Sequence, residues 1–521
     1  MSSGHNSLVN RAAATPMAGR PIALETDPDL LAGYLEDAAH YPGGRAIALA
    51  RPRSLEEVSW VVRQAATVLP VGAQSSLTGG ATPAGDAVLS TERLTDIHVT
   101  SDRVVAGAGV TLRALQEALA TRGRWFPPVP TYLGATVGGV VATNAAGAAT
   151  FKYGPVRRWV QALTLVLANG DVLRVARGAV RARDREFVLA TSDGERRVRV
   201  PAIRMPDVPK CSAGYFAEPG MDLVDLFIGS EGTLGVIVEA ELEHRPRPAG
   251  VCWLLSALES EEAAIALTGD LRTEPLLDVA AIEHLDRRSL DLVREDGVDR
   301  RLAIDIPRHA AVVLLIQLEL SAMEVEQGLA DAPLARLTEM LDQYGVAESA
   351  EVVLPSDQRR AAAFTELREA VPAGANRRVA VAQARDARIH KTAADMVVPF
   401  DRFAEMLREC RRLADSLDLD LAVWGHISDG NVHPNVLPRS YQDVERGREL
   451  ILELARRVIA MGGSPLAEHG VGRNSVKQAL LEMLYGLDGI DEMRRLKRGF
   501  DPTWKLGSGV LFDRKSSSHA G

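Results

Sequence analysis

The amino-acid sequence predicts an α+β protein of two or three domains. Its 521 residues exceed the roughly 150 that one domain usually holds. Helix-like and strand-like stretches mix over residues 49–246, and the chain from there to about residue 420 has the pattern of an antiparallel sheet with helices on one face. With 46% hydrophobic and 25% charged residues, the composition is that of a globular protein.

The first part of the chain combines helices, strands and loops rich in glycine. Ser54 and Glu57 form the pattern of a capping box, which predicts a helix over residues 54–67. Strands are expected to end at Pro70 and to cover Ala87–Ser90, and a further strand and helix are expected over residues 103–126, with Gly123 as the helix stop.

Two later segments complete the first part of the chain, up to residue 246, and the strands after them begin a second part. The stretch ALTLVLANGDVLRV predicts a hairpin that turns at Asn169-Gly170-Asp171. Asp225–His244 predicts two strands joined by a tight glycine turn. After Arg245–Gly250, the stretches VCWLLSAL and AVVLLIQLEL predict strands that alternate with helices. A polar amphipathic helix is expected from Asn474 onward.

Composition also narrows the class of protein. The net charge is −9 and no basic run occurs, which argues against a nucleic-acid partner. Cys211, Cys252 and Cys410 are too far apart in the chain for a metal-binding motif and are odd in number, which favours a reducing compartment.

Residues 1–24 lack the apolar core of a signal peptide, so we expect a disordered tail. No uncharged apolar run approaches the roughly 18 residues of a membrane span. We expect a cytoplasmic protein, and peripheral contact with the inner membrane stays open.

The segment WGHISDGNVHPN (Trp424–Asn435) raises the question of a metal site. If Asp429-Gly430 is a two-residue turn, His426 faces His433 across a hairpin, and such partners have Cβ atoms about 4.5–5.5 Å apart. Both imidazoles would then reach one cation. The alternative is a buried hairpin with two hydrogen-bonded histidines.

A second segment, PLAEHG, places a carboxylate beside a third histidine. Two histidines plus Glu468 form a ligand set that leaves one position open for a substrate, as in catalytic zinc sites. Mixed nitrogen and oxygen ligands also accept manganese, cobalt or iron(II). The alternative for Glu468 is a first-turn carboxylate on the helix that follows.

Two loops have little side-chain bulk. Val71–Gly80 follows a strand, and its backbone amides and hydroxyls could hold a phosphate or pyrophosphate. It has no GK[ST] ending, and Gly107-Ala-Gly109 lacks the third glycine of a dinucleotide fingerprint. Gly134–Gly147 lets the backbone approach a flat ligand closely. Simple tight packing of the loops is the alternative.

Six motifs occur in one order along the chain: LPVGAQSSLTGGATP, PTYLGATVGGVVATNAAGAATFKYGPVRRWV, LFIGSEGTLGVI, GHISDGNVHPN, AEHGVG and FDPTWKLGSG. Together they resemble the FAD-dependent D-2-hydroxy acid dehydrogenases over roughly residues 25–512. That group includes cytochrome-type D-lactate dehydrogenase, the glycolate oxidase flavoprotein subunit and D-2-hydroxyglutarate dehydrogenase. It belongs to the vanillyl-alcohol oxidase superfamily with PCMH-type FAD binding. The chain departs from the family pattern at Ser428 and at Gly507-Ser508.

The resemblance implies a domain layout and a noncovalent FAD. After the tail (1–24) would come a PCMH-type FAD-binding domain of two subdomains (25–246), an antiparallel, ferredoxin-like α+β substrate cap (247–420) and a largely helical C-terminal segment (421–521) that returns to the flavin. The residues implied to contact FAD are Gly72, Ala73, Gln74, Ser75, Ser76, Thr78, Gly79, Thr131, Gly134, Ala135, Thr136, Gly138, Gly139, Thr143, Asn144, Gly147, Glu231, Gly235 and Ile237.

The resemblance also implies roles at the active site. His426, His433 and Glu468 match ligands of a divalent metal, with zinc the expected ion, and His469 matches the proposed base. Arg368, Lys391 and Asn435 match substrate-binding positions. An arginine fork suits a carboxylate. The alternative for Arg368 and Lys391 is a solvated helix charge.

The implied reaction is oxidation of a D-2-hydroxy acid (D-lactate-like, glycolate or 2-hydroxyglutarate) to the 2-oxo acid. Metal-assisted proton abstraction would accompany hydride transfer to flavin N5. Electrons would pass on to a quinone, a cytochrome, an electron-transfer flavoprotein or oxygen, and a homodimer stays open. The alternatives are a flavin transferase similar to alkylglycerone-phosphate synthase, a metal-free aryl-alcohol or phenol oxidase, and a zinc hydrolase without flavin.

Overall fold

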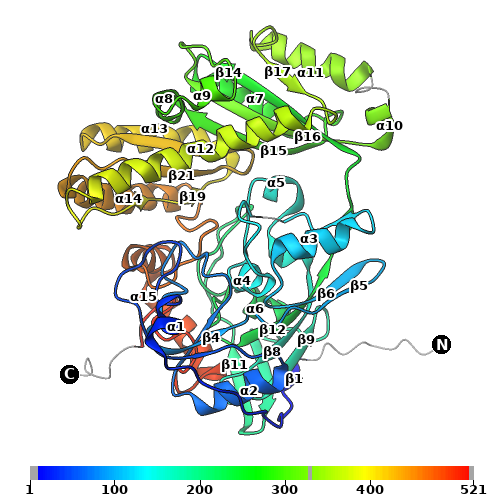
Figure 1. Cartoon of the computed structure of the whole chain (residues 1–521), viewed down its shortest axis with the longest axis vertical. Coiled ribbons are helices and arrows are strands. Elements are labelled where there is room, and N and C mark those ends of the chain that lie inside the picture. The colour runs from blue at the N-terminus through cyan, green and yellow to red at the C-terminus, as the bar shows by residue number, and fades with distance from the viewer. Residues whose placement is uncertain (1–9, 129, 327–330, 515–521) are drawn as a thin grey trace.

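The computed structural model describes residues 10–128, 130–326 and 331–514. Figure 1 shows two lobes: the lower one contains the first part of the chain and the last helix, and the upper one contains the middle of the chain. The chain passes from the lower to the upper lobe between β13 (Arg245–Pro246) and β14 (Gly250–Leu258). The predicted α+β architecture with a separate cap is confirmed.

The lower lobe is built on one parallel and one antiparallel sheet. The parallel sheet has the spatial order β2 (Arg45–Ala50), β4 (Ala84–Ser90), β3 (Val68–Val71). The antiparallel sheet has the order β5 (Ile97–Val99), β6 (Arg103–Gly107), β12 (Val236–Glu243), β8 (Val160–Val166), β9 (Val172–Ala176). A two-stranded ladder joins β7 (Arg124–Trp125) to β13.

Local signals in the sequence account for most of these elements. The predicted helix is α2 (Leu55–Gln64), and the Ser54 hydroxyl accepts from the Glu57 backbone N–H at 3.4 Å. The Glu57 carboxylate accepts from the Arg53 N–H instead of closing a reciprocal box. The other lower-lobe helices are α1 (Pro28–Ala32), α3 (Leu112–Ala120), α4 (Val137–Ala142), α5 (Thr150–Tyr153), η1 (Val156–Trp159) and α6 (Val224–Phe227).

Two predictions for this lobe are wrong in part. The first strand expected within Asp225–His244 is a helical turn, α6, because a short buried apolar run has no period that separates helix from strand. Within the expected disordered tail, β1 (Arg11–Ala13) pairs in parallel with β10 (Glu186–Thr191), whose other edge pairs with β11 (Gly194–Arg199). The free edge of β10 supplies the backbone partners that order this segment. Residues 1–9 lie outside the described part of the chain.

The upper lobe is built on one antiparallel sheet. Its spatial order is β17 (Glu351–Val353), β14, β16 (Val312–Leu320), β15 (Val279–Asp286), β20 (Leu421–His426), β21 (Asn431–Val436), β18 (Thr392–Ala393), and β19 (Met396–Val397) also pairs with β21. Since β20 and β21 extend this sheet, the cap continues past residue 420, where we expected its end.

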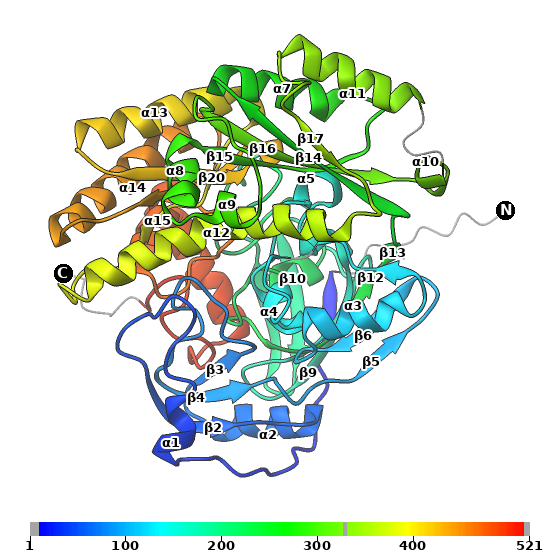
Figure 2. The same cartoon turned by 45° about the horizontal axis from the view of Figure 1, so that its top comes forward.

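Helices cover both faces of the cap sheet, so the prediction of helices on one face is wrong. On β16, Val313 and Leu315 pack with one set of helices and Leu314 and Ile316 with the other. The first set is α8 (Arg287–Glu295), α9 (Val298–Arg301) and α12 (Gln358–Gln383). The second set is α7 (Glu261–Thr273), α11 (Asp331–Gln343), α13 (Phe403–Ser416) and α14 (Tyr441–Ala460), with α10 (Ala322–Glu326) and η2 (Phe400–Arg402) at its margins. Figure 2 shows α12 on one side of the sheet and α7, α11 and α13 on the other. Burial of both faces makes the strands nearly continuous apolar runs, and this pattern in β16 was the sequence signal for a second helix layer.

The C-terminal segment returns to the lower lobe. The predicted helix is α15 (Ser475–Phe500), and the Asn474 side chain accepts from the N–H groups of Val476 and Lys477. Beyond it, Leu506 forms a parallel bridge with Val68 of β3. The first histidine-containing motif therefore lies in the cap sheet, and the second lies on the segment that leads from the cap to α15 of the lower lobe.

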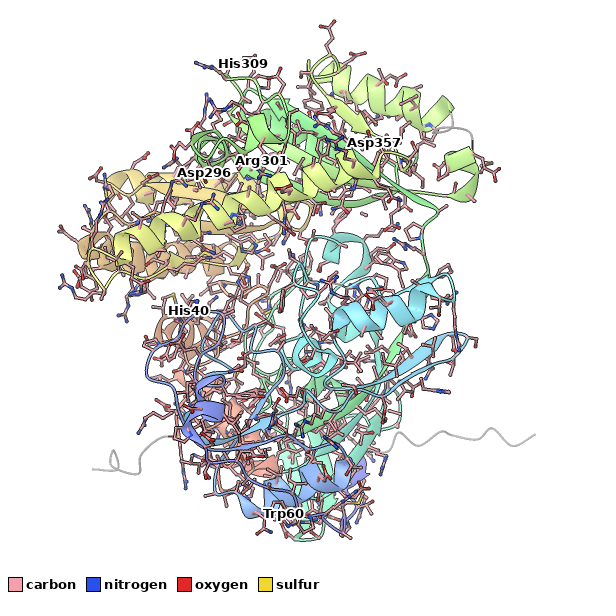
Figure 3. All side chains as sticks on the ribbon, viewed as in Figure 1. His40, Trp60, Asp296, Arg301, His309 and Asp357 are labelled. Carbon is pink, nitrogen blue, oxygen red and sulfur yellow. The ribbon has the colours of Figure 1, made fainter. Side chains whose placement is uncertain are left out.

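The outer surface is rich in charge. The side chains labelled in Figure 3 include His309 and Arg301 on the cap and His40 on the lower lobe. Arg301 pairs with Glu366 on α12. Among the described residues, we find no helix with the length and apolarity needed to cross a bilayer.

Candidate active site

The histidines and the glutamate singled out in the sequence come together between the lobes. Ligand atoms of His426, His433 and Glu468 all lie within 4.8 Å of one another. His426 ends β20, His433 lies on β21, and Glu468 follows Leu466, which bridges Asp395. Both the cap sheet and the C-terminal segment therefore contribute to one cluster.

The hairpin register differs from our prediction. Residues Ile427–Asp429 form a 3-10 turn, η3, closed by Gly430 at φ 74°, in place of a two-residue turn. His433 pairs with Trp424 rather than with His426. A shift by two residues keeps side chains on the same face of the strand, so the two imidazoles still meet, with ring centroids 5.6 Å apart. The Ser428 hydroxyl accepts from the Ile282 N–H at 3.2 Å, which ties this turn to β15.

Carboxylates orient the imidazoles of the cluster. His426 has Nδ1 at 3.0 Å from Glu283 Oε1 and Nε2 at 3.4 Å from Glu468 Oε1. His433 has Nε2 at 3.6 Å from Glu468 Oε2. These separations are close to the distance expected between ligand atoms that each lie about 2.0–2.2 Å from a shared ion. An outer carboxylate on the far ring nitrogen is the usual partner of a metal-bound histidine.

A buried lysine that we did not single out in the sequence completes the cluster. Lys210 Nζ lies 2.6 Å from Asp429 Oδ2 and 2.6 Å from Glu468 Oε1, and its side chain is fully buried. It also donates to the Gly147 carbonyl at 3.4 Å. Burial disfavours its charge, but the two carboxylates outweigh this and raise the pKa of Lys210. The lower lobe thus holds the cap motif through one ammonium group.

The balance of buried charge suits a divalent cation. Four carboxylates (Glu283, Asp395, Asp429 and Glu468) and two cations (Lys210 and Arg368) are joined by the contacts of this cluster. With neutral histidines their formal charge is −2, and buried charge is costly unless it is compensated. A divalent ion on His426, His433 and Glu468 would compensate it, so the residues present fit such an ion.

The protonation states of the cluster agree with this balance. Burial opposes charging of His426, but Glu283 and Glu468 outweigh it and raise its pKa to about 9. Burial lowers the pKa of His433. Burial also opposes ionisation of Glu468, but Lys210 and His426 hold its pKa well below the usual range. The raised pKa shows that the surrounding carboxylates favour a positive charge at this position, which a bound divalent ion would supply.

The three predicted substrate-binding residues lie in different environments. Arg368 lies between the lobes: its guanidinium donates to Thr131 Oγ1 at 2.8 Å and lies 3.3 Å from Glu283 Oε1. Asn435 is buried beside His433, and its Oδ1 has no hydrogen-bond partner among the described residues. Lys391 is exposed just before β18 and makes no hydrogen bond or ion pair with any described residue. The structure brings only Arg368 and Asn435 to the cluster.

The three segments predicted to bind FAD meet beside this cluster. A Cβ atom on Gly72 would lie 2.2 Å from Thr136 Oγ1, so the first and second loops are in contact there. The Glu231 N–H donates to the Ala142 carbonyl at 2.7 Å, which joins the third segment to the second. The Gly472 N–H donates to the Glu231 carboxylate at 2.9 Å. The surface that these loops share is mostly backbone, which suits close approach of a large flat cofactor.

Several predicted FAD residues have structural contacts of their own. The Gln74 amide donates to the carbonyls of Tyr34 and Glu36 at 3.1 and 3.0 Å. The Ser76 hydroxyl accepts from the N–H groups of Thr78 and Gly80. Gly235 and Ile237 are buried at the start of β12. These contacts shape the loops, and the cofactor roles of these residues stay predictions.

Sequence reasoning missed three charged residues of the site: Lys210, Glu283 and Asp395. Glu283 lies on β15 with the His426 ring against it. None of the three stands in a spacing that predicts chemistry. A charge in a largely apolar strand, as at Glu283 in VAAIEHLD, was the available signal.

The site thus combines a cap, loops rich in glycine and a cluster of titratable residues between them. Residues 46–176 match the FAD binding domain and residues 247–511 match the C-terminal domain of FAD linked oxidases. The chain belongs to the FAD-linked oxidase family.

Curated relatives cover nearly the whole chain. It is 29% identical over 490 residues to glycolate oxidase subunit GlcD of Bacillus subtilis, covering 92% of each chain. It is 30% identical over 472 residues to D-lactate dehydrogenase of Archaeoglobus fulgidus, covering 88% of this chain and 90% of that one. It is 29% identical over 507 residues to D-2-hydroxyglutarate dehydrogenase of Xanthomonas citri pv. viticola, covering 94% of each.

Solved structures share the fold. A 4-ethylphenol oxidase from Gulosibacter chungangensis superposes with a TM-score of 0.65 at 16% identity, covering 94% of each chain. An alkyldihydroxyacetonephosphate synthase superposes with a TM-score of 0.62 at 14% identity, covering 95% of this chain and 84% of that one. The chain therefore shares the fold of these two proteins, in agreement with its match to the FAD binding domain over residues 46–176.

Proposed function

We propose that this protein oxidises a D-2-hydroxy acid to the corresponding 2-oxo acid. The observation that carries the proposal is the cluster of His426, His433 and Glu468 next to His469, at the place where the predicted FAD loops meet the cap. The relatives named for D-lactate, D-2-hydroxyglutarate and glycolate chemistry support the substrate class.

Residues of this chain would hold the substrate at both of its functional groups. His426, His433 and Glu468 would bind a divalent ion, with zinc the expected metal, which supplies Lewis acidity toward the hydroxyl and carboxylate oxygens. Arg368 would pair with the substrate carboxylate, because its planar guanidinium offers two parallel donors. Asn435 Oδ1, which has no partner, would accept from a hydroxyl group.

Proton and electron transfer are divided between the protein and the flavin. His469 would take the hydroxyl proton as the general base, and the carbonyl forms as the Cα–H bond breaks. Noncovalently bound FAD supplies the acceptor for the hydride. The two electrons would then leave to a quinone, a cytochrome or an electron-transfer flavoprotein.

An anaerobic flavin-reduction screen tests this function. The purified protein would be mixed with D-lactate, D-2-hydroxyglutarate, glycolate and the L-enantiomers, and the flavin absorbance followed with and without a chelator. We expect bleaching by at least one D-hydroxy acid or glycolate, and loss of bleaching with the chelator. A His469→Asn variant should keep its FAD and not bleach. Bleaching by His469→Asn at the wild-type rate would contradict the role of the base.

The same screen separates the alternatives. A transferase without net redox chemistry would accumulate no reduced flavin with any hydroxy acid. A metal-free aryl-alcohol or phenol oxidase would bleach with an aromatic alcohol and be insensitive to the chelator. A hydrolase without flavin would give a colourless protein.

A further inference from the structure

We propose that Asp395 is a positioning residue that sets the tautomers of both His469 and His433, so that each presents Nε2 to the reacting centre. This inference rests on the proposed function for the roles of the two histidines. The tautomer assignment does not depend on that function, because it concerns only which ring nitrogen of each histidine carries hydrogen.

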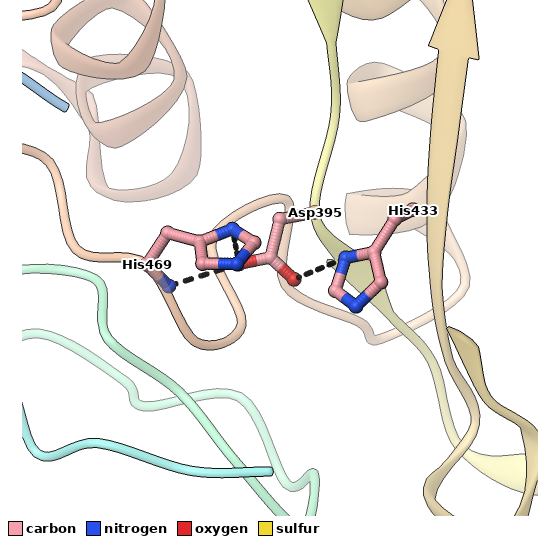
Figure 4. Close-up of side chains that lie close together, drawn as sticks. All are labelled: Asp395, His433 and His469. Atoms are coloured by element: carbon pink, nitrogen blue, oxygen red, sulfur yellow. Dashed lines mark hydrogen bonds and ion pairs between the residues drawn. The ribbon is translucent and has the colours of Figure 1, made fainter. Parts of the chain in front are cut away.

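One oxygen of Asp395 holds the segment that carries the base. Asp395 lies between β18 and β19 and is 1% exposed. Its Oδ2 accepts from the backbone N–H groups of Glu468 at 2.7 Å and His469 at 3.0 Å, and it lies 3.0 Å from His469 Nδ1. Figure 4 shows the carboxylate between the two rings. The backbone bonds place Glu468 and His469 together, and the ring contact fixes the direction of the imidazole.

The other oxygen faces the metal-ligand histidine. Oδ1 lies 3.4 Å from His433 Nδ1 and accepts from the Asn431 amide at 3.1 Å. The rings of His433 and His469 are 5.3 Å apart, with 37° between their planes. A single carboxylate thus lies against Nδ1 of both rings.

The tautomers follow from the chemistry of the carboxylate. An ionised carboxylate only accepts hydrogen bonds, so its charge favours hydrogen on each ring nitrogen that lies against it, at 3.0 Å for His469 Nδ1 and 3.4 Å for His433 Nδ1. In a neutral imidazole the other nitrogen, Nε2, then has the free lone pair. A lone pair at Nε2 is what His469 needs to accept a proton and what His433 needs to bind a metal. The negative charge of Asp395 also stabilises the imidazolium that forms when His469 is protonated.

The geometry makes an isosteric change informative. In Asp395→Asn, the amide oxygen stays at the Oδ2 position, because it still accepts from the N–H groups of Glu468 and His469, and the NH₂ group, which can only donate, faces His433. His433 must then present a bare Nδ1 and carry its hydrogen on Nε2, which removes the lone pair that would bind a metal, while His469 loses the negative charge that stabilises its imidazolium. The side-chain volume changes little, so the fold has no steric reason to change.

The first test reads the tautomers in the wild-type holoenzyme. With ¹⁵N-labelled histidine, long-range proton–nitrogen NMR spectra distinguish hydrogen on Nδ1 from hydrogen on Nε2. We expect His469 and His433 both to carry hydrogen on Nδ1, with assignments from the His469→Asn and His433→Asn variants. Hydrogen on Nε2 of neutral His469 would overturn the inference. This readout needs no substrate, so it stands even if the proposed reaction fails.

The second test compares Asp395→Asn with Asp395→Glu and with the exposed Asp401→Asn as control. For Asp395→Asn we expect flavin reduction at saturating substrate to fall about 100-fold to 10,000-fold, and zinc affinity to fall about tenfold to 100-fold. KM should change less than the reduction rate. Asp395→Glu should recover part of both losses, and Asp401→Asn should lose neither. Wild-type zinc affinity and reduction rate in Asp395→Asn would overturn the inference. A wild-type enzyme that no hydroxy acid reduces would contradict the proposed function but not the tautomer assignment.

Discussion

Lys210 Nζ and Glu468 Oε1 lie 2.6 Å apart, and their side chains are 0% and 7% exposed. The two residues are 258 positions apart in the chain. Their ion pair joins a loop of the lower lobe to the segment that carries the candidate base. The ion pair therefore ties the candidate metal-ligand cluster to the lower lobe.

Removing the lysine should destabilise the folded protein. Lys210→Met leaves Asp429 and Glu468 buried without their shared cation, and breaking a buried pair costs about 3–5 kcal/mol. We expect the free energy of unfolding in urea to fall by that amount. The double variant Lys210→Met/Asp429→Asn should lose less, since one uncompensated charge is gone. A loss of under about 1 kcal/mol for Lys210→Met would contradict the role of this pair.

Removing the metal should lower both stability and activity. An ion that binds only the folded state stabilises it by about 2.7 kcal/mol at 100 times its Kd. Chelator treatment should therefore lower the melting temperature and stop flavin bleaching by hydroxy acids, and added zinc should restore both.

The Glu468→Gln variant should retain FAD but bind less zinc than the wild type, as measured by elemental analysis. His309→Ala, on the exposed cap surface, is the control. A melting temperature that does not respond to chelator would contradict the site.

Loss of the arginine at the lobe interface should weaken substrate binding. Arg368→Met removes the proposed partner of the substrate carboxylate, and a hydrogen bond to a charged group is worth about 1.5–3 kcal/mol. We expect KM to rise about tenfold to 100-fold, with a smaller change in kcat. Arg301→Met removes an exposed ion pair with Glu366 of α12 and should change neither constant. An unchanged KM in Arg368→Met would place the carboxylate contact elsewhere.

Glu231 should make the FAD-free protein less stable as the pH rises. Burial raises the pKa of its carboxyl from 4.5 to about 7, against the hydrogen bonds from Val471 and Gly472. Between these values the folded state binds the proton more tightly than the unfolded state, so stability is highest at the acid end and falls toward pH 7. We expect Glu231→Gln to remove a slope on the order of 1–3 kcal/mol between pH 5 and pH 8. The measurement is urea unfolding of the apoprotein of both forms. Parallel curves would contradict the shift.

Local sequence patterns predicted the elements that depend on neighbouring residues. The capping pattern at Ser54 located α2, and the Asn-Gly-Asp run located the turn between β8 and β9. The motif order indicated the family that the comparisons show. Such signals lie within a few residues of the structure they specify, so one chain is enough to reveal them.

The prediction failed where a partner from a distant segment decides the structure. Free backbone on β10 orders Arg11–Ala13, which by composition is a tail. The register of β20 and β21 depends on η3 and on its contact with β15, which no local spacing encodes. Lys391 matches a substrate position by motif and is exposed just before β18, and its substrate role stays a prediction.

The sequence by itself determined which side chains could act: His426, His433, Glu468 and His469 have the donor atoms of a metal site and a base. Only the tertiary structure decided how they are held. Lys210, Glu283 and Asp395 come from three separate segments, and they surround the imidazoles because buried charges require compensation by opposite charge and hydrogen bonds. That requirement acts between atoms in space, so it leaves no regular spacing in the chain.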